Sequence, residues 1–489
     1  MNWNKQITLV IGPVVGILLM LYGNLDASHA TIWRMIGVVF WVAWWWMTEA
    51  VNLAVTSLLP FVLLPILGIV DSKTVAEKYF DQIIFLFIGG FMISYAVEKW
   101  NLHQRLSLSI LMRLGKNPSY ILAAVMGTTF FISMWMSNTA TVMMLITAVL
   151  AIYNAMKDRL TEAESRDIAT ALLLGLAYSA SLGGMATLVG TPTNLIFYSK
   201  FGEFYPDNEQ LTFASWLAVG FPVALGLLVF NFLVLRYHYI GASAKLEFDR
   251  RMFATAYEDL GKFSYEEKIV TAIGATTALL WFTRSSIKIG SYSLFGWGSW
   301  FPKDFVQDST VAIAMALLLF LIPSKQRAGE RILHWSDVQR LPFGIVLLFG
   351  GGFALAKGFE VSGLDRYLAQ QLDFLHQAPP ILLLLGVAAM VCIISELASN
   401  VASIQLVLPI LKALQITTGL PPILLMMPAT LAASLGFMLP VATAPNTIVF
   451  GTGLVELKAM YRVGFWLDVM GIILIVGLSM LLIPLVFGG

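Results

Sequence analysis

Three adjacent hydrogen-bonding side chains interrupt the apolar stretch 131–149, where residues 137–139 read Ser-Asn-Thr. Such groups are costly in hydrocarbon unless they face one another, water or a ligand. The same pattern recurs 262 residues later, where residues 399–401 read Ser-Asn-Val inside the apolar stretch 393–411. The repetition predicts that the two triplets are the two halves of one binding site.

A break rich in glycine and proline follows each triplet, SLGGMATLVGTPTN at 181–194 and SLGFMLPVATAPN at 434–446. Glycine and proline interrupt helical hydrogen bonds, which frees carbonyl oxygens at one half-helix end and amide donors at the other. Freed carbonyls suit a small hard cation such as sodium, and the positive end of a half-helix dipole suits an anion. These residue types therefore predict a site for sodium together with an anion.

Basic side chains are scarce around the triplets. Of the Lys and Arg residues, only Lys412 lies within the two apolar stretches 118–156 and 378–418 that contain the triplets. A bound anion would then need accompanying cations, because desolvating an ion costs several kcal/mol even after relaxation. Co-transported sodium would offset that cost and supply the driving force.

Glu396, three residues before Ser399, supports a competing hypothesis in which a proton is the coupling ion. The alternative role for Glu396 is structural, with its carboxylate held by backbone amides or by a serine. At the shift of 262 residues Glu396 matches Met134, whereas Ser133 matches Ser395. That symmetry favours a pair of sodium sites.

The composition defines the elements that must position these residues. A chain of 489 residues with 58% hydrophobic and 12% charged residues is a polytopic membrane protein. Its net charge of +1 excludes nucleic acid as a partner, and its one cysteine, Cys392, excludes an intramolecular disulfide. We find no HExxH, GxSxG or phosphate-binding motif, so an intramembrane hydrolase is a remote alternative.

Eleven apolar runs have the length that crosses a bilayer. They fall near 7–22, 32–48, 53–70, 82–97, 168–198, 212–235, 267–283, 309–323, 341–357, 422–453 and 463–487. The stretches 118–156 and 378–418 are too long for one span, and we predict that each is a re-entrant hairpin. The predicted fold is all-α, with about 11 transmembrane helices and two re-entrant hairpins.

The chain also predicts an inverted repeat. Residues 89–91 match 351–353 at the same shift as the triplets, and 191–194 match 443–446 at a shift of 252. With the N-terminus in the cytoplasm, most Lys and Arg residues fall in cytoplasmic loops. The C-terminus is then outside the cell's inner (plasma) membrane, and the two hairpins open from opposite faces.

Two connecting segments differ from the spans. Residues 237–268 are charged and amphipathic, which predicts an interfacial linker helix on the cytoplasmic side. Residues 285–300 are rich in aromatic side chains, which predicts a position at the level of the lipid headgroups.

The paired triplets resemble those of the divalent anion:sodium symporter family, which includes INDY-type dicarboxylate transporters and citrate and sulfate carriers. GTPTN at 190–194, ATAPN at 442–446 and MTEAVNLAVTSLLP at 47–60 extend the resemblance over essentially the whole chain. It implies a homodimer in which a transport domain moves against a scaffold by an elevator motion. The implied scaffold is 1–80 and 212–340, the implied transport domain 81–211 and 341–462, and 463–489 is the last helix.

The resemblance also assigns residues to the site. The first sodium would be bound by Ser133, Ser137, Asn138 and Gly190, and the second by Ser395, Ser399, Asn400 and Ala442. The substrate carboxylates would meet Asn138, Thr139, Asn400, Val401, Thr443 and Pro445. Sodium is the coupling ion, and no other cofactor is expected.

The resulting expectation is sodium-coupled symport of C4-dicarboxylates such as succinate, malate and fumarate. Citrate or sulfate transport, anion exchange, and proton coupling through Glu396 are the alternatives.

The asymmetry between Thr139 and Val401 generates the first prediction. Val401→Thr supplies the hydroxyl that the second triplet lacks, and one hydrogen bond to a charged group is worth about 1.5–3 kcal/mol. We therefore expect the order of preference among succinate, citrate and sulfate to change, as measured by competition against labelled succinate. An unchanged order would show that residue 401 does not contact the ligand.

Overall fold

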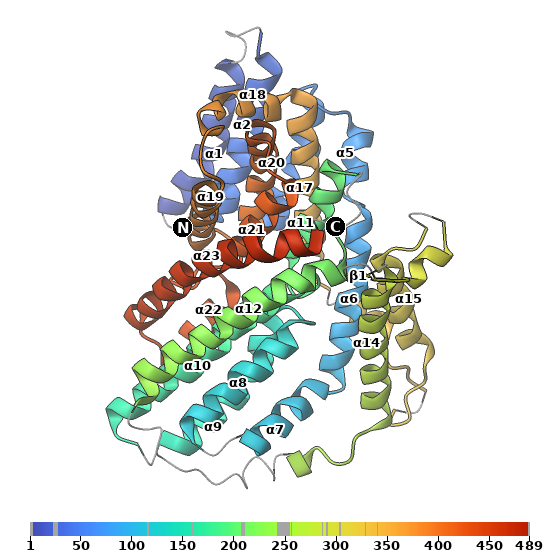
Figure 1. Cartoon of the computed structure of the whole chain (residues 1–489), viewed down its shortest axis with the longest axis vertical. Coiled ribbons are helices and arrows are strands. Elements are labelled where there is room, and N and C mark those ends of the chain that lie inside the picture. The colour runs from blue at the N-terminus through green and yellow to red at the C-terminus, as the bar shows by residue number, and fades with distance from the viewer. Residues whose placement is uncertain are drawn as a thin grey trace. The chain divides into compact units, whose positions relative to one another are not determined.

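The computed structural model describes residues 3–22, 28–114, 117–157, 160–206, 211–241, 255, 257–285, 287–289, 292–302, 305–327, 329–339 and 341–487. The chain is an almost entirely helical membrane protein (Figure 1). Eight helices in the described part are long and apolar enough to cross a bilayer. The chain forms two compact units, each built from segments that are distant in sequence.

The first unit comprises Met1–Ile84, Ile196–Asn208 and Pro342–Ala433. Its helices are α1 (Trp3–Tyr22), α2 (Ala30–Thr48), α3 (Leu53–Thr56), α4 (Leu59–Ile66), α5 (Ser72–Lys78), α17 (Phe343–Ser362), α18 (Leu364–Gln371), η4 (Asp373–Leu375), α19 (Pro380–Leu397), α20 (Asn400–Thr418) and α21 (Pro422–Ala433). Its core is an apolar cluster that includes Met35, Trp46, Leu64 and Phe359.

The second unit comprises Phe85–Leu195, Glu209–Leu341 and Ser434–Gly489. Its elements are α7 (Leu102–Leu114), α8 (Pro118–Ser133), α9 (Asn138–Lys157), α10 (Glu162–Ala186), α12 (Phe213–Leu235), η1 (Arg236–Ile240), α14 (Tyr265–Arg284), β1 (Ile287–Ile289), β2 (Tyr292–Leu294), η3 (Trp297–Trp300), α15 (Asp308–Leu321), α16 (Trp335–Val338), α22 (Ala444–Phe450) and α23 (Leu457–Phe487). Helix α6 (Gln82–Lys99) begins in the first unit and lies mainly in the second, and α11 (Pro192–Phe204) crosses between them.

Helix α10 is the centre of the second unit. A capping box between Thr161 and Glu164 starts it, and every residue from Ile168 to Ala186 is buried. Helices α8, α9 and α12 pack against it, as the ribbon shows (Figure 1). A helix that is apolar on all sides needs such a complete cover, so α10 is a core helix rather than a lipid-facing one.

The helix pairs expected around both triplets and both breaks are present. The triplets lie between α8 and α9 and between α19 and α20, and the breaks lie between α10 and α11 and between α21 and α22. One expected span is wrong as a continuous helix, because 53–70 contains two short helices, α3 and α4. Pro60 explains the interruption, since proline fits the first turn of a helix and disrupts its interior.

A short antiparallel pair of strands departs from the expected all-helical chain. β1 pairs with β2 in the register Ile287↔Leu294. These strands lie in the aromatic segment 285–300, in which Phe295 and Trp300 are exposed. The headgroup position expected for this segment stays a prediction, and the strands themselves were not predicted.

The interfacial linker predicted at 237–268 lies partly outside the described residues, which omit 242–254 and 256. Its C-terminal end is not a solvated charged face, because α14 already begins at Tyr265 and buries Glu266 and Glu267. Arg105 donates to Glu267 Oε1 at 2.7 Å, and the amides of Lys325 and Gln326 donate to Glu266 Oε1 at 2.7 and 2.9 Å. These partners explain the burial, which composition alone does not reveal.

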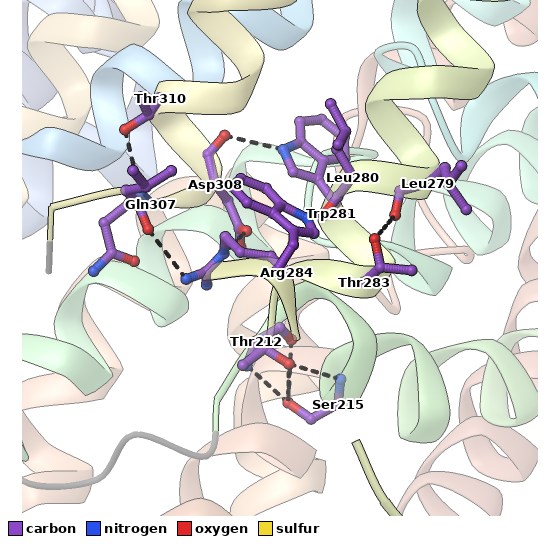
Figure 2. A network of polar contacts seen from close by, with 12 residues as sticks. Thr212, Ser215, Leu279, Leu280, Trp281, Thr283, Arg284, Gln307, Asp308 and Thr310 are labelled. Carbon is purple, nitrogen blue, oxygen red and sulfur yellow. Dashed lines mark hydrogen bonds and ion pairs between the residues drawn. The ribbon is translucent and has the colours of Figure 1, made fainter. Parts of the chain in front are cut away.

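A polar network ties α14 to the start of α15 (Figure 2). Arg284 Nε lies 2.5 Å from Asp308 Oδ1, with 12% and 3% of the two side chains exposed. The indole of Trp281 donates to the Asp308 carbonyl at 2.9 Å. The Phe213 ring, at the start of α12, lies 5.1 Å from the Trp281 ring and 6.2 Å from that of Trp135 in the first hairpin. This network therefore supports the end of the unit next to the first triplet.

Removing the cation of this pair should destabilise the protein strongly. Arg284→Met leaves Asp308 as a buried, uncompensated charge, and breaking a buried pair costs about 3–5 kcal/mol. Arg166→Met is the matched control, because its pair with Glu456 is 62% exposed on both sides and such pairs contribute about 0–1 kcal/mol. Thermal melting in detergent should show a large loss for Arg284→Met alone, and equal melting temperatures for the two variants would contradict the assignment.

Candidate binding site

The first triplet forms the tip between α8 and α9. Ser133, the last residue of α8, is fully buried and donates its hydroxyl to Asn138 Oδ1 at 2.8 Å. Ser137 Oγ accepts from the amide of Ala140 at 3.2 Å, which caps α9. The turn is therefore closed by its own side chains, and the Ala140 amide finds its partner within the protein.

The second triplet repeats this arrangement between α19 and α20. Ser395 donates to Asn400 Oδ1 at 2.8 Å, again over five residues. The same hydroxyl lies 2.6 Å from the carbonyl oxygen of Ala433, so one hydrogen is shared between two acceptors. The expected match of Ser133 with Ser395 is confirmed at the level of a hydrogen bond.

The first break meets the first tip. Helix α10 ends at Ala186 and α11 begins at Pro192. Between them, the Thr187 hydroxyl donates to the Met134 carbonyl at 2.5 Å and accepts from the Gly190 amide at 3.1 Å. Thr187 thus joins the break to the tip.

Two glycines allow the closest approach between break and tip. A Cβ on Gly184 would lie 2.2 Å from Asn138 Oδ1, and a Cβ on Gly190 would lie 2.6 Å from the Gly184 carbonyl and 3.0 Å from that of Ser133. Neither overlap can be relieved cheaply, because the neighbours are backbone atoms or the held amide of Asn138. The four residues expected at the first sodium, Ser133, Ser137, Asn138 and Gly190, therefore lie together in one unit.

A small pocket adjoins these residues. Gly90 and Ser94 of α6 line it together with Ser137 and Gly190. The Ser94 hydroxyl donates to the Trp135 carbonyl at 2.5 Å, which holds the tip against α6. The pocket brings the first member of the glycine repeat, residues 89–91, next to the triplet.

The other predicted residues occupy helix starts and turns. Thr139 is half-buried in α9, Ser399 precedes α20, Thr443 precedes α22, and Pro445 is buried in the first turn of α22. Ser395, Ser399 and Asn400 belong to the first compact unit, and Ala442, Thr443 and Pro445 belong to the second. Val401 packs against the apolar cluster of the first unit. An apolar side chain fits this contact, which was not predicted from the sequence.

The first tip offers neutral oxygen atoms that could act as ligands of a cation. Ser133 Oγ, Asn138 Oδ1 and the carbonyls beside Gly190 keep lone pairs that the hydrogen bonds described above do not use. In the described part of the chain, no group of three His, Cys, Asp or Glu side chains could hold a metal ion. Oxygen ligands without a high negative charge suit sodium rather than a transition metal.

Two features of the structure were not predicted from the sequence. Lys200 is 2% exposed in α11, but it pairs with Glu203 at 2.6 Å, and Lys78 donates to the same carboxylate at 2.7 Å. The asparagines that end the two break motifs, Asn194 and Asn446, are fully buried. The match of Asn194 with Asn446 at a shift of 252 residues was the sequence signal that could have identified them.

The comparisons with known proteins cover the whole chain. The family described as the sodium:sulfate symporter transmembrane region matches residues 2–487. A Staphylococcus saprophyticus protein named sodium-dependent dicarboxylate transporter SdcS is 37% identical over 493 residues, covering 100% of this chain and 93% of that protein. The protein of that name from Staphylococcus aureus strain MRSA252 is 38% identical over 494 residues, covering 99% and 92%.

A solved structure shares the fold. Neisseria gonorrhoeae MtrF, described as illuminating a class of antimetabolite efflux pumps, matches with a TM-score of 0.55 and 13% identity. The match covers 83% of this chain and 82% of MtrF. At this identity the likeness concerns the fold alone.

The close packing of Gly184 on Asn138 generates a prediction. Gly184→Ala must displace the Asn138 side chain and with it the bond from Ser133, so we expect sodium affinity to fall about tenfold or more, the effect of one hydrogen bond of about 1.5 kcal/mol. The sodium-dependent rise in melting temperature of the purified protein measures this. Gly127→Ala in α8 is the control, because a Cβ there meets no atom within 4 Å. Unchanged sodium affinity in Gly184→Ala would refute the assigned role of this contact.

Proposed function

The chain belongs to the sodium:sulfate symporter family and is a membrane transporter rather than an enzyme, and from that premise we propose that it imports C4-dicarboxylates together with sodium. One observation carries the proposal. In each half a buried serine donates a hydrogen bond of 2.8 Å to the asparagine that begins the next helix, from Ser133 to Asn138 and from Ser395 to Asn400. Each half thereby presents hydroxyl, amide and carbonyl oxygens suited to a sodium ion.

Sodium is assigned to two sites in this proposal. The first is Ser133, Ser137, Asn138 and Gly190, and the second is Ser395, Ser399, Asn400 and Ala442. The ligands in both sites are neutral oxygen atoms. A bound cation would therefore add a positive charge for the anion, which hydrogen bonds from neutral groups do not supply. The names of the staphylococcal relatives, which state sodium dependence, support this coupling.

The anion is assigned to the amide and hydroxyl donors at the helix starts. One carboxylate meets Asn138 and Thr139, and the other meets Asn400 with Thr443 and Pro445 nearby. Helix N-termini favour negative charge because their amides and dipole point toward it. The relatives named for dicarboxylates support a carbon-based dianion, and the family description supports sulfate as the second candidate.

The finer architecture belongs to the same proposal. We assign 11 spans, two re-entrant hairpins in inverted repeats, a cytoplasmic N-terminus and an external C-terminus. Scaffold segments 1–80 and 212–340 and transport segments 81–211 and 341–462 would move relative to each other as an elevator in a homodimer. Sodium and substrate would cross the membrane together with the transport segments.

Uptake of labelled succinate into proteoliposomes tests the function. An inward sodium gradient should drive accumulation, whereas the same gradient of choline should not. Unlabelled malate and fumarate should compete more strongly than sulfate or citrate. The absence of sodium-driven uptake of all four carboxylates would refute the proposal, and stronger competition by sulfate would favour the second candidate.

Asn138→Ala and Asn400→Ala should each abolish uptake without unfolding the protein. Each substitution removes the amide that accepts from the buried serine and that the proposal assigns to the ligand in its own half. Asn154→Ala is the control, because Asn154 is exposed on the same helix as Asn138. Uptake and melting temperature are measured together, and normal uptake by either site variant would remove that residue from the site.

A further inference from the structure

Two buried asparagines outside the predicted sites hold the two breaks. Asn194 Nδ2 lies 3.1 Å from the carbonyl oxygen of Gly184, 3.4 Å from that of Met185 and 2.7 Å from that of Thr187. Asn446 Nδ2 lies 2.9 Å from the carbonyl of Gly436 and 3.1 Å from that of Leu439. Each amide therefore reaches back across its own break.

The two clamps are related by the repeat. At a shift of 252 residues, Asn194 matches Asn446, Gly184 matches Gly436, and Thr187 matches Leu439. The acceptor is a backbone carbonyl in each case, so the clamp is kept where threonine is replaced by leucine. Recurrence of the same donor and the same two acceptor positions in both halves indicates a shared role.

The acceptors are carbonyls that the breaks release. Helix α10 ends at Ala186, so its last carbonyls have no partner in a continuing helix. The carbonyls of Gly184 and Met185 in α10 and of Thr187 just after it converge on one amide group, whose two hydrogens keep the oxygens from repelling one another. Asn194 is therefore one of the side chains that fix the shape of the break, together with Thr187 and with Trp216, whose indole donates to the Met185 carbonyl at 3.2 Å.

The first clamp is connected to the first triplet through Gly184. Asn194 holds the Gly184 carbonyl, and Gly184 lies so close to Asn138 that a Cβ would come within 2.2 Å of Asn138 Oδ1. Asn138 in turn accepts from Ser133. Movement of the break would therefore move the oxygen atoms assigned to the first sodium.

The acceptor end of each amide is buried without compensation. Asn194 Oδ1 and Asn446 Oδ1 have no hydrogen-bond partner among the described residues, although both side chains are fully buried. An unpaired buried acceptor is unfavourable. The hydrogen bonds donated by Nδ2 must therefore decide how each asparagine side chain is oriented. This asymmetry indicates that the donated hydrogen bonds are the reason for asparagine at these positions.

We propose that Asn194 is a positioning residue that sets sodium affinity in the first half by clamping the carbonyls of the break, and that Asn446 holds the second break in the same way. The proposal rests on the sodium coupling proposed above. Neither residue contacts the ion in this account, and each acts through the backbone it holds.

Asn194→Asp is the most informative variant. It keeps the size and Oδ1 but replaces the donor with a second acceptor, which faces three carbonyl oxygens. Asn231→Asp is the matched control, because Asn231 is a fully buried asparagine of α12 whose side chain has no hydrogen-bond partner among the described residues. Asn194→Ser, which keeps one donor, serves if Asn194→Asp is not monodisperse.

Sodium titration of melting temperature in detergent, with choline keeping ionic strength constant, provides a readout independent of transport. We expect the half-saturating sodium concentration to rise about 10- to 100-fold in Asn194→Asp, the usual effect of losing a partner that orients a ligand. The half-saturating succinate concentration for uptake at saturating sodium should change much less.

The outcomes separate the two proposals. If the unsubstituted protein is not stabilised by sodium, both the proposed sodium coupling and the positioning role of Asn194 are refuted. If it is stabilised, and Asn194→Asp or Asn194→Ser has the same half-saturating sodium concentration, the positioning role alone is refuted. An equal shift in Asn231→Asp also refutes it, because the effect would then be a general consequence of a buried substitution.

Discussion

Broken backbone inside apolar helices must find its hydrogen bonds within the protein, since hydrocarbon offers none. The first half meets this constraint with a threonine that joins tip to break and an asparagine that binds the carbonyls of the break. A serine closes the tip itself by donating to the side chain of Asn138. The serine and the asparagine recur in the second half. The binding site proposed above uses some of the polar atoms that close these breaks.

Closing the breaks with neutral groups has an electrostatic consequence. Hydroxyls, amides and carbonyls orient a dianion but supply no full positive charge, and Lys200 is already paired with Glu203. A cation bound on the carbonyl side and an anion bound on the amide side of the same turns would therefore stabilise each other. In this account coupling follows because every residue assigned to the ligands is neutral.

The sequence predicts the parts of this arrangement that repeat. The two triplets locate both tips, and Pro192 and Pro445 locate the half-helices that follow the breaks, because backbone chemistry restricts where such residues fit. Contacts between segments that are distant in the sequence cannot be predicted from such local patterns. The pairing of Arg105 with Glu267 buries charges that look solvated in sequence, and the clamp of Asn194 depends on a turn whose shape emerges only after folding. The packing of Val401 on an apolar cluster is of the same kind.

Calorimetric titration of succinate into the purified protein at a series of sodium concentrations tests the central claim most directly. If sodium supplies the charge that the site lacks, succinate affinity must rise with sodium, and sodium affinity must rise by the same factor when succinate is present. We expect both changes. The same succinate Kd in sodium and in choline would contradict it.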